Sequence, residues 1–215
     1  MKELSSRVLQ CDRARGANAY VVRGRRGLVL IDPGLTSNVT RIARAMVQAG
    51  MSPYHVTEVL LTHYDPDHAA SADEWVRRTG ARLWIGAADA AIMRRETPVP
   101  RTPFRRLTAR FAPGLASPAE LLATETEIAE GFRAVPTPGH TPGHTAFLHD
   151  GFAFIGDAAL VGVDGALNRM PTFLDADPHQ ADATRARLRE WEVGWFCCGH
   201  SAPARVGRGP RVAHH

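Results

Sequence analysis

The chain has 215 residues, of which 44% are hydrophobic and 22% are charged, a composition typical of a globular protein with one or two domains and a buried core. The net charge is +4, and nearly all of the positive charge is arginine because Lys2 is the only lysine. This charge is mild for the length, so a general preference for arginine explains it better than an anionic partner does.

The three cysteines, Cys11, Cys197 and Cys198, have no regular spacing. This pattern argues against a disulfide framework and against a zinc ribbon, and it favours buried reduced thiols. The N-terminal segment lacks the apolar core of a signal peptide. No stretch of the sequence reaches the roughly 18 apolar residues of a membrane span. We therefore expect a cytoplasmic protein without a membrane partner.

The first half of the chain alternates short apolar strands with helices. Residues 18–34 predict a β-hairpin whose turn lies at Gly24–Gly27, because both arms are β-branched and apolar. The next predicted elements are a helix over 35–50 with apolar positions at helical spacing, a buried strand over 55–63, a helix over 69–80 and a strand over 81–86.

The segment from 94 to 110 is rich in arginine and contains three prolines, so it predicts a surface loop or lid. Binding of an anionic substrate group and docking of nucleic acid are the two alternatives for its arginines. Nucleic acid is disfavoured because the segment lacks interleaved aromatic residues. Strands are expected again within 126–160, followed by a helix over 178–194 and a last strand over 195–200. The pattern predicts an α/β chain with mixed sheets.

Histidine and aspartate cluster where the predicted strands end. His63 and His68 lie in "THYDPDH", His140 lies in "PTPGHTPGH", His200 lies in "CCGHSAP", and Asp157 ends the run "FIGD". Loops that follow neighbouring strands converge at one edge of a sheet. Imidazole and carboxylate ligands without cysteine suit a catalytic zinc, iron or manganese site.

The spacing within "HYDPDH" suits two metal ions. His63 and Asp65 lie two residues apart, so they face the same way in an extended chain. Pro66 then forces a turn, and Asp67 and His68 begin the following helix. One turn can therefore offer ligands to each of two neighbouring metals, an arrangement known in hydrolysis.

These motifs, in this order, resemble those of the metallo-β-lactamase superfamily, in which H-x-H-x-D-H is followed by a distant His, a bridging Asp and a final Gly-His. The upstream "LVLIDPG" resembles the family's strand end, with Asp32 in a structural or supporting role. The resemblance runs from about Asn18 to His200 and implies a four-layer αβ/βα sandwich of two mixed β-sheets flanked by helices. We expect a single domain over 1–207 and a disordered tail over 208–215.

The resemblance also implies a ligand set for two divalent ions, with zinc preferred over iron or manganese. His63 and His140 would bind the first metal. The second metal would be bound by Asp67, His68 and His200. Asp157 would bridge the two metals, with a hydroxide lying between them. Asp67 is also the candidate catalytic residue, and no organic cofactor is implied. The complete set of predicted metal residues is His63, Asp65, Asp67, His68, His140, Asp157 and His200.

Asp65 stands where the family usually has histidine, and carboxylates occur there in the flavodiiron branch. Three carboxylates against two divalent ions leave a charge of +1, whereas the usual two carboxylates leave +2. This count predicts a less acidified bound water and a shift towards iron or manganese.

The remaining histidines are expected outside the ligand set. His55 is predicted at the surface, and His149 is predicted in a hairpin turn. His179 is predicted to begin the last helix, and His144 is predicted to have a supporting or packing role. Tyr64 should point away from its flanking ligands by strand alternation. Cys197 and Cys198 are expected to be inert core thiols.

The predicted function is hydrolysis of a small ester-like bond, in a thioester, lactone or ester, by a monomer or homodimer. The motifs look closest to the glyoxalase II-like and lactonase-like branches, although the chain leaves no room for the C-terminal domain of glyoxalase II. The alternatives are an iron-dependent oxidoreductase, a phosphodiesterase or nuclease, and a non-catalytic binding module. A β-lactamase is disfavoured because Lys2 cannot supply that group's carboxylate-binding lysine.

Overall fold

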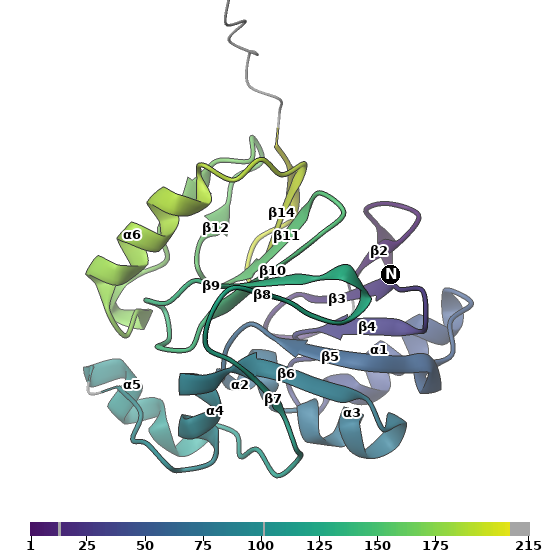
Figure 1. The fold of residues 1–215 in the computed structure, drawn as a ribbon, viewed down its shortest axis with the longest axis horizontal. Coiled ribbons are helices and arrows are strands. Elements are labelled where there is room, and N and C mark those ends of the chain that lie inside the picture. Colours follow the sequence, from purple (N-terminus) through teal and green to yellow (C-terminus); the bar gives the residue numbers. More distant parts are fainter. Residues whose placement is uncertain (13, 101, 207–215) are drawn as a thin grey trace, which may run out of the picture.

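The protein is described by a computed structural model that covers residues 1–12, 14–100 and 102–206. The predicted tail, 208–215, lies outside these residues. Two β-sheets pack face to face, with helices on both outer faces (Figure 1). This is the predicted four-layer sandwich with mixed sheets.

The first sheet has seven strands in sequence order, antiparallel from β1 to β4 and parallel from β4 to β7. The predicted hairpin is confirmed, since Tyr20 pairs with Ile31 and Arg23 with Leu28. The strands are β1 (Lys2–Glu3), β2 (Val8–Cys11), β3 (Ala19–Arg23), β4 (Leu28–Ile31), β5 (Val56–Leu61), β6 (Arg82–Gly86) and β7 (Glu120–Leu122).

The second sheet has the order β15-β14-β11-β10-β9-β8, and only the β11–β14 pair is parallel. Its strands are β8 (Thr126–Glu127), β9 (Arg133–Pro136), β10 (Thr145–His149), β11 (Phe152–Gly156), β14 (Trp195–Cys198) and β15 (Ala204–Arg205). A separate two-stranded ribbon consists of β12 (Leu160–Val161) and β13 (Leu167–Asn168).

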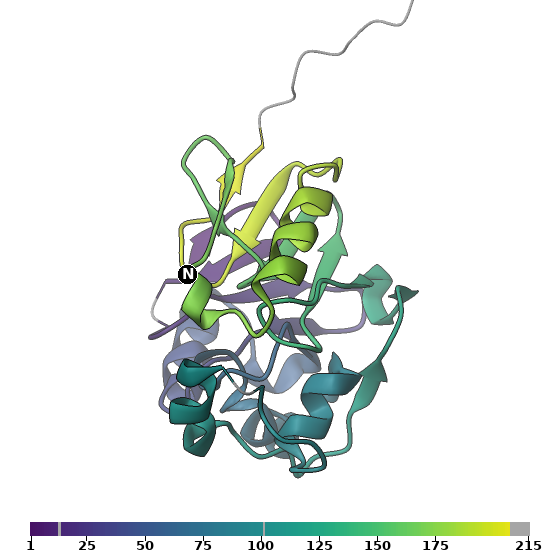
Figure 2. The ribbon, with the colours of Figure 1, turned by 90° about the vertical axis from the view of Figure 1, so that its left-hand side faces the viewer.

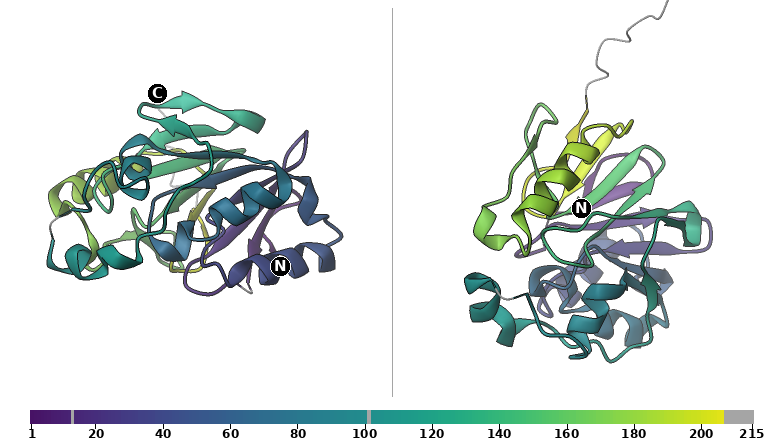
Figure 3. Two further views of the ribbon diagram at one scale, coloured as in Figure 1. Left: turned by 90° about the horizontal axis from the view of Figure 1, so that it is seen from below. Right: turned by 60° about the vertical axis from the view of Figure 1, so that its left-hand side comes forward.

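The helices cover the two outer faces. The blue helices α1 and α3 lie over the first sheet in the view from below (Figure 3), and α6 covers the second sheet. The helices are α1 (Asn38–Gln48), α2 (Pro66–Ala69), α3 (Ala72–Thr79), α4 (Ala87–Met93), α5 (Pro103–Thr108) and α6 (Pro178–Leu188), with short 3₁₀ turns η1 (Pro53–His55), η2 (Ala109–Phe111), η3 (Ala129–Gly131) and η4 (Thr172–Leu174).

Three buried apolar clusters separate the four layers. Neighbouring residues of one strand enter different clusters: Leu60 packs between the sheets, whereas Leu61 packs under the helices of the first sheet. Cys197 and Cys198 divide in the same way, between the sheets and under α6. This alternation follows from the two-residue period of a strand, and it explains why β5 and β14 are apolar on both faces.

Residues 94–100 of the arginine-rich segment form an irregular and partly exposed stretch, as predicted. The prediction is wrong for residues 103–108, which form helix α5 and lie with α6 at the same end of the two sheets (Figure 2). Proline does not break the chain at this point because Pro103 occupies the first position of α5, where proline is well tolerated. No helix in the described ranges combines the length and the apolar character needed to cross a membrane.

Candidate metal centre

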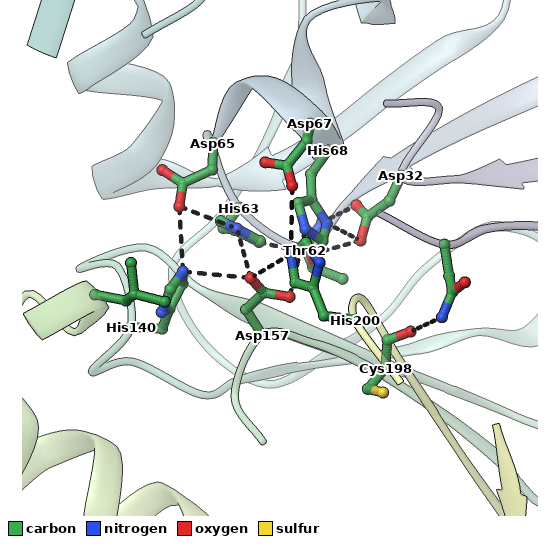
Figure 4. Close-up of polar contacts among 12 residues, drawn as sticks. Asp32, Thr62, His63, Asp65, Asp67, His68, His140, Asp157, Cys198 and His200 are labelled. Carbon is green, nitrogen blue, oxygen red and sulfur yellow. Dashed lines mark hydrogen bonds and ion pairs between the residues drawn. The ribbon is translucent and has the colours of Figure 1, made fainter. Parts of the chain in front are cut away.

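The predicted site residues meet at the edge of the sandwich where strands of both sheets end. His63 follows β5 and Asp32 follows β4, which is parallel to β5. Asp157 and His200 follow the parallel strands β11 and β14 of the other sheet. Figure 4 shows these side chains pointing toward one another across the gap between the sheets.

A first cluster contains His63, His140 and Asp157, whose ligand atoms lie within 4.8 Å of one another. Asp157 Oδ2 lies 3.9 Å from His63 Nε2 and 3.6 Å from His140 Nε2. Asp65 Oδ2 lies beside the same two nitrogens, at 3.5 Å and 3.1 Å. Ligands roughly 2.0–2.2 Å from a tetrahedral metal are roughly 3.3–3.6 Å apart, so these separations suit one ion.

A second cluster contains Asp67, His68 and His200. His200 Nε2 lies 3.3 Å from Asp67 Oδ2 and 3.1 Å from Asp157 Oδ2. His68 Nε2 faces Asp157 Oδ1 at 3.3 Å. Asp157 therefore borders both clusters, because Oδ2 faces His63, His140 and His200 whereas Oδ1 faces His68.

Buried polar atoms without hydrogen-bond partners provide the test of whether a metal fits. His63 Nε2, His68 Nε2 and Asp157 Oδ1 are inaccessible to solvent and lack a hydrogen bond. Leaving such groups unpaired costs about 1–3 kcal/mol each. Three of them aimed into one space, all of ligand type, fit a divalent cation that would satisfy them together.

A second ring of contacts fixes the orientation of the imidazoles. Asp32 Oδ2 lies 2.9 Å from His68 Nδ1 and accepts a 2.7 Å hydrogen bond from the Thr62 hydroxyl. Thr62 Oγ1 in turn lies 2.9 Å from His63 Nδ1. These contacts leave Nε2 of both rings facing the centre, as metal-binding histidines require.

Two further contacts support the His140 side of the centre. His140 Nδ1 lies 3.3 Å from Asp175 Oδ1, and Asp175 is buried beside Arg185. His144 is not in either cluster: its Nε2 accepts a 3.2 Å hydrogen bond from the Asp157 backbone N–H, and its ring stacks on His63. His144 thus has a supporting position, in line with the prediction for it.

Protonation of the histidines reflects the crowded carboxylates. Hydrogen bonds to Asp157 and Asp67 raise the pKa of His200 to about 10. Burial opposes protonation of His140, but hydrogen bonds with Asp175 and Asp65 outweigh it and raise its pKa to about 9. Burial and the neighbouring His68 lower the pKa of His63. Burial also opposes protonation of His68, but Asp157 and Asp32 outweigh it and raise the pKa of His68 well above its usual value, so the carboxylates favour the protonated form of three of the four imidazoles.

Asp89 was missed from the sequence because no motif marks it. It is buried on α4 and accepts hydrogen bonds from the Tyr64 N–H, the Thr141 hydroxyl and the Gly143 N–H. Burial raises its pKa to about 7, although these hydrogen bonds oppose the shift. Asp89 ties the turn that follows His63 to the loop that carries His140.

Arg105 was missed as well, and it corrects the charge count made from the sequence. It extends from α5 into the centre, where its side chain is 3% exposed and pairs with Asp65 Oδ1. It also lies over the Tyr64 ring and donates a hydrogen bond to the Tyr64 hydroxyl. The charge of Asp65 is therefore balanced by a cation that the count omitted.

Three other histidines of the described ranges lie away from the centre. His55 and His179 are exposed, the latter at the start of α6. His149 ends β10 beside the hairpin turn and stacks on Phe132 with ring centroids 4.3 Å apart.

Residues 12–200 match the family model described as the metallo-beta-lactamase superfamily. The uncharacterized protein YobT of Bacillus subtilis is 32% identical over 66% of this chain and 61% of its own length. A hydroxyacylglutathione hydrolase of Acidiphilium cryptum is 41% identical over 47% of this chain and 31% of its own length. The alignments thus cover 61% and 31% of the lengths of these two relatives.

Solved structures agree in fold. A B3 metallo-beta-lactamase with an active-site glutamic acid superposes with a TM-score of 0.73 at 20% identity, covering 97% of this chain and 82% of that one. The protein TTHA1623, solved in a di-iron-bound form, gives 0.66 at 24% identity over 88% and 89% of the two chains. With the family model matched across almost the whole described chain, the protein belongs to the metallo-beta-lactamase superfamily.

Proposed function

We propose that this protein is a hydrolase that uses two divalent metal ions to cleave an ester-like bond in a small molecule. The observation that carries the proposal is the convergence of two ligand clusters on Asp157, with three buried ligand atoms that make no hydrogen bond. Two neighbouring metal positions of this kind are typical of hydrolytic centres.

The ligands divide between the two positions by proximity. The first position would use Nε2 of His63 and His140 and Oδ2 of Asp65, and the second would use Asp67 and Nε2 of His68 and His200. Asp157, which borders both clusters, would contribute its carboxylate to both positions. The nitrogen and oxygen donor set favours zinc, and the carboxylate at position 65 makes iron the main alternative.

Bound divalent ions would lower the pKa of a water and polarise the oxygen of the scissile carbonyl. Asp67 and His200 mark where substrate enters, because their side chains are 29% and 31% exposed whereas those of His63 and His68 are fully buried. Burial opposes ionisation of Asp67, but its hydrogen bond with His200 and the charge of His68 lower its pKa. An ionised Asp67 at the accessible face can accept a proton from the attacking water.

A thioester is the preferred substrate class. The relatives named hydroxyacylglutathione hydrolase, from Acidiphilium cryptum and Alkalilimnicola ehrlichii among others, support this choice, since their name denotes cleavage of an acyl–sulfur bond. The second of these aligns at 29% identity over 84% of this chain, a span that includes the predicted ligands from His63 to Asp157. Lactones and simple esters share the same electrophilic carbonyl and are the next candidates.

The test combines metal analysis with a substrate panel of thioesters, lactones, aryl esters, phosphodiesters and a β-lactam. We expect two metals per chain and turnover of the carbonyl substrates. His140→Ala should lose the two-metal content and the turnover. His179→Ala, which changes an exposed histidine at the start of α6, is the matched control. Turnover that survives in His140→Ala, or a wild-type protein that binds no metal, would refute the proposal.

A further inference from the structure

The Arg105 guanidinium is buried at the first metal position. Its Nε and Nη2 donate to the Leu174 carbonyl at 3.2 Å and 2.9 Å, and Nη2 also donates to the His140 carbonyl at 2.9 Å. Phe104 beside it packs edge-to-face on Phe173 of η4. These contacts hold α5 against the segment that precedes α6 and fix the guanidinium in place.

The charged end of Arg105 reaches the atoms that the first metal would use. Nη1 pairs with Asp65 Oδ1. Nη2 lies 3.1 Å from His140 Nε2, the same distance at which Asp65 Oδ2 approaches that nitrogen. Asp65 is therefore already paired with a cation that belongs to the protein, and the same cation lies beside the His140 ring.

The second metal position has no such competitor. Among the described residues, the ion-pair partners of Asp67 and of Asp157 are histidines alone, and His68 contacts Asp32 and Asp157. These histidines lose their protons when a metal binds, whereas an arginine stays charged at every relevant pH. The two positions thus differ in whether a permanent positive charge lies beside them.

We propose that Arg105 is a positioning residue that competes with the metal at the first position and makes that position bind more weakly than the second. The proposal rests on the ligand set of the proposed function. A metal ion entering between His63 and His140 meets a fixed positive charge beside His140 and must share Asp65 with it. A permanent cation within hydrogen-bond distance of two ligands lowers the affinity for a second cation at the same place.

Metal affinity measured on each position separately tests this role. Metal-free wild-type protein is titrated with Zn²⁺ against a chromophoric chelator, and the number of bound ions is counted by native mass spectrometry. We expect two ions with unequal affinities. In Arg105→Ala the weaker affinity should rise by about tenfold or more, the usual size of an effect from outside the ligand shell, whereas the stronger one should stay within about twofold.

Three further variants separate charge from packing. Arg105→Gln is neutral but can still donate to the Leu174 carbonyl, so it should behave as Arg105→Ala and serves if the alanine variant does not fold. Arg105→Lys keeps the charge and should keep the weaker affinity low. Arg106→Ala removes an exposed arginine of the same helix and should match the wild type. Circular dichroism of each metal-free variant checks that it is folded.

Two results would overturn the proposal: folded neutral variants whose weaker affinity is unchanged or reduced, and an Arg105→Lys variant that gains affinity as the neutral variants do. Either would limit Arg105 to packing. A wild-type protein that binds no zinc at all would instead refute the proposed metal centre, so the two failures are distinguishable.

Discussion

Gly199 is the position where a single methyl group tests the geometry of the metal centre. A Cβ atom there would lie 2.2 Å from Asp157 Oδ1 and 2.6 Å from His68 Cε1. Ordinary contact begins near 3.4 Å, so the Asp157 carboxylate would have to move by about 1 Å. Metal–ligand distances hold within about 0.2 Å, so Asp157 cannot serve both metals after such a shift.

We expect Gly199→Ala to lower metal affinity by at least about 100-fold, or about 2.7 kcal/mol, and to reduce the stability of the metal-free fold by about 1–3 kcal/mol through overpacking. Chelator competition measures the first quantity and urea unfolding the second. Gly114→Ala is the matched control, because a Cβ atom there meets nothing within 4 Å. Gly199→Ala protein that still binds two metals with wild-type affinity would refute the proposed role of Asp157.

Three other predictions follow from contacts around the centre. Asp32→Asn keeps the size of the side chain but removes the charge that orients the His68 imidazole. Metal affinity should therefore fall about 10–100-fold, and a chelator titration indistinguishable from wild type would contradict this. Asp65→His leaves Arg105 buried without its carboxylate and should cost about 3 kcal/mol or more in urea unfolding; unchanged stability would show that the pair is not buried in solution. The pKa values of His140 and His200 are raised to about 9 and about 10, and, against the effect of burial, Asp157 and Asp32 hold the pKa of His68 well above its usual value. Loading at pH 7 should therefore release about three protons, and metal affinity should fall as pH falls; calorimetry in buffers of different ionisation enthalpy measures this, and the absence of proton release would refute it.

Long apolar strands and amphipathic helices were predictable from the sequence. The β3–β4 hairpin, β5 and α1 lie where the alternation of strand residues and the helical spacing of apolar residues placed them. Helix α6 begins at the predicted residue, Pro178, but ends at Leu188 and not at 194. The strands that sequence reasoning missed are only two to four residues long, too short for an alternation of apolar and polar residues to mark them: β1, β2, β7, β12, β13 and β15.

The residues at the site also divide into those that the sequence predicts and those that it does not. His63, Asp157 and His200 each end an apolar strand, and the carboxyl ends of parallel strands meet at one edge, so their convergence could be expected. Asp89, Asp175 and Arg105 reach the same place from helices or their approaches and follow no recognisable motif. Their contacts with the loop of His140 depend on how the helices pack, which periodicity does not specify.

The charge count at Asp65 changes once the contacts made by the helices are known. Counting residues in the motif left two divalent ions and three carboxylates with a charge of +1, but Arg105 lies 40 residues further along the chain and pairs with Asp65. Including it returns the count to +2, the value of the usual site with two carboxylates. The expectation of a less acidified water therefore loses its electrostatic basis. Any effect of Asp65 on metal choice must come from carboxylate ligation itself, so a change to histidine there would need a matching change at Arg105.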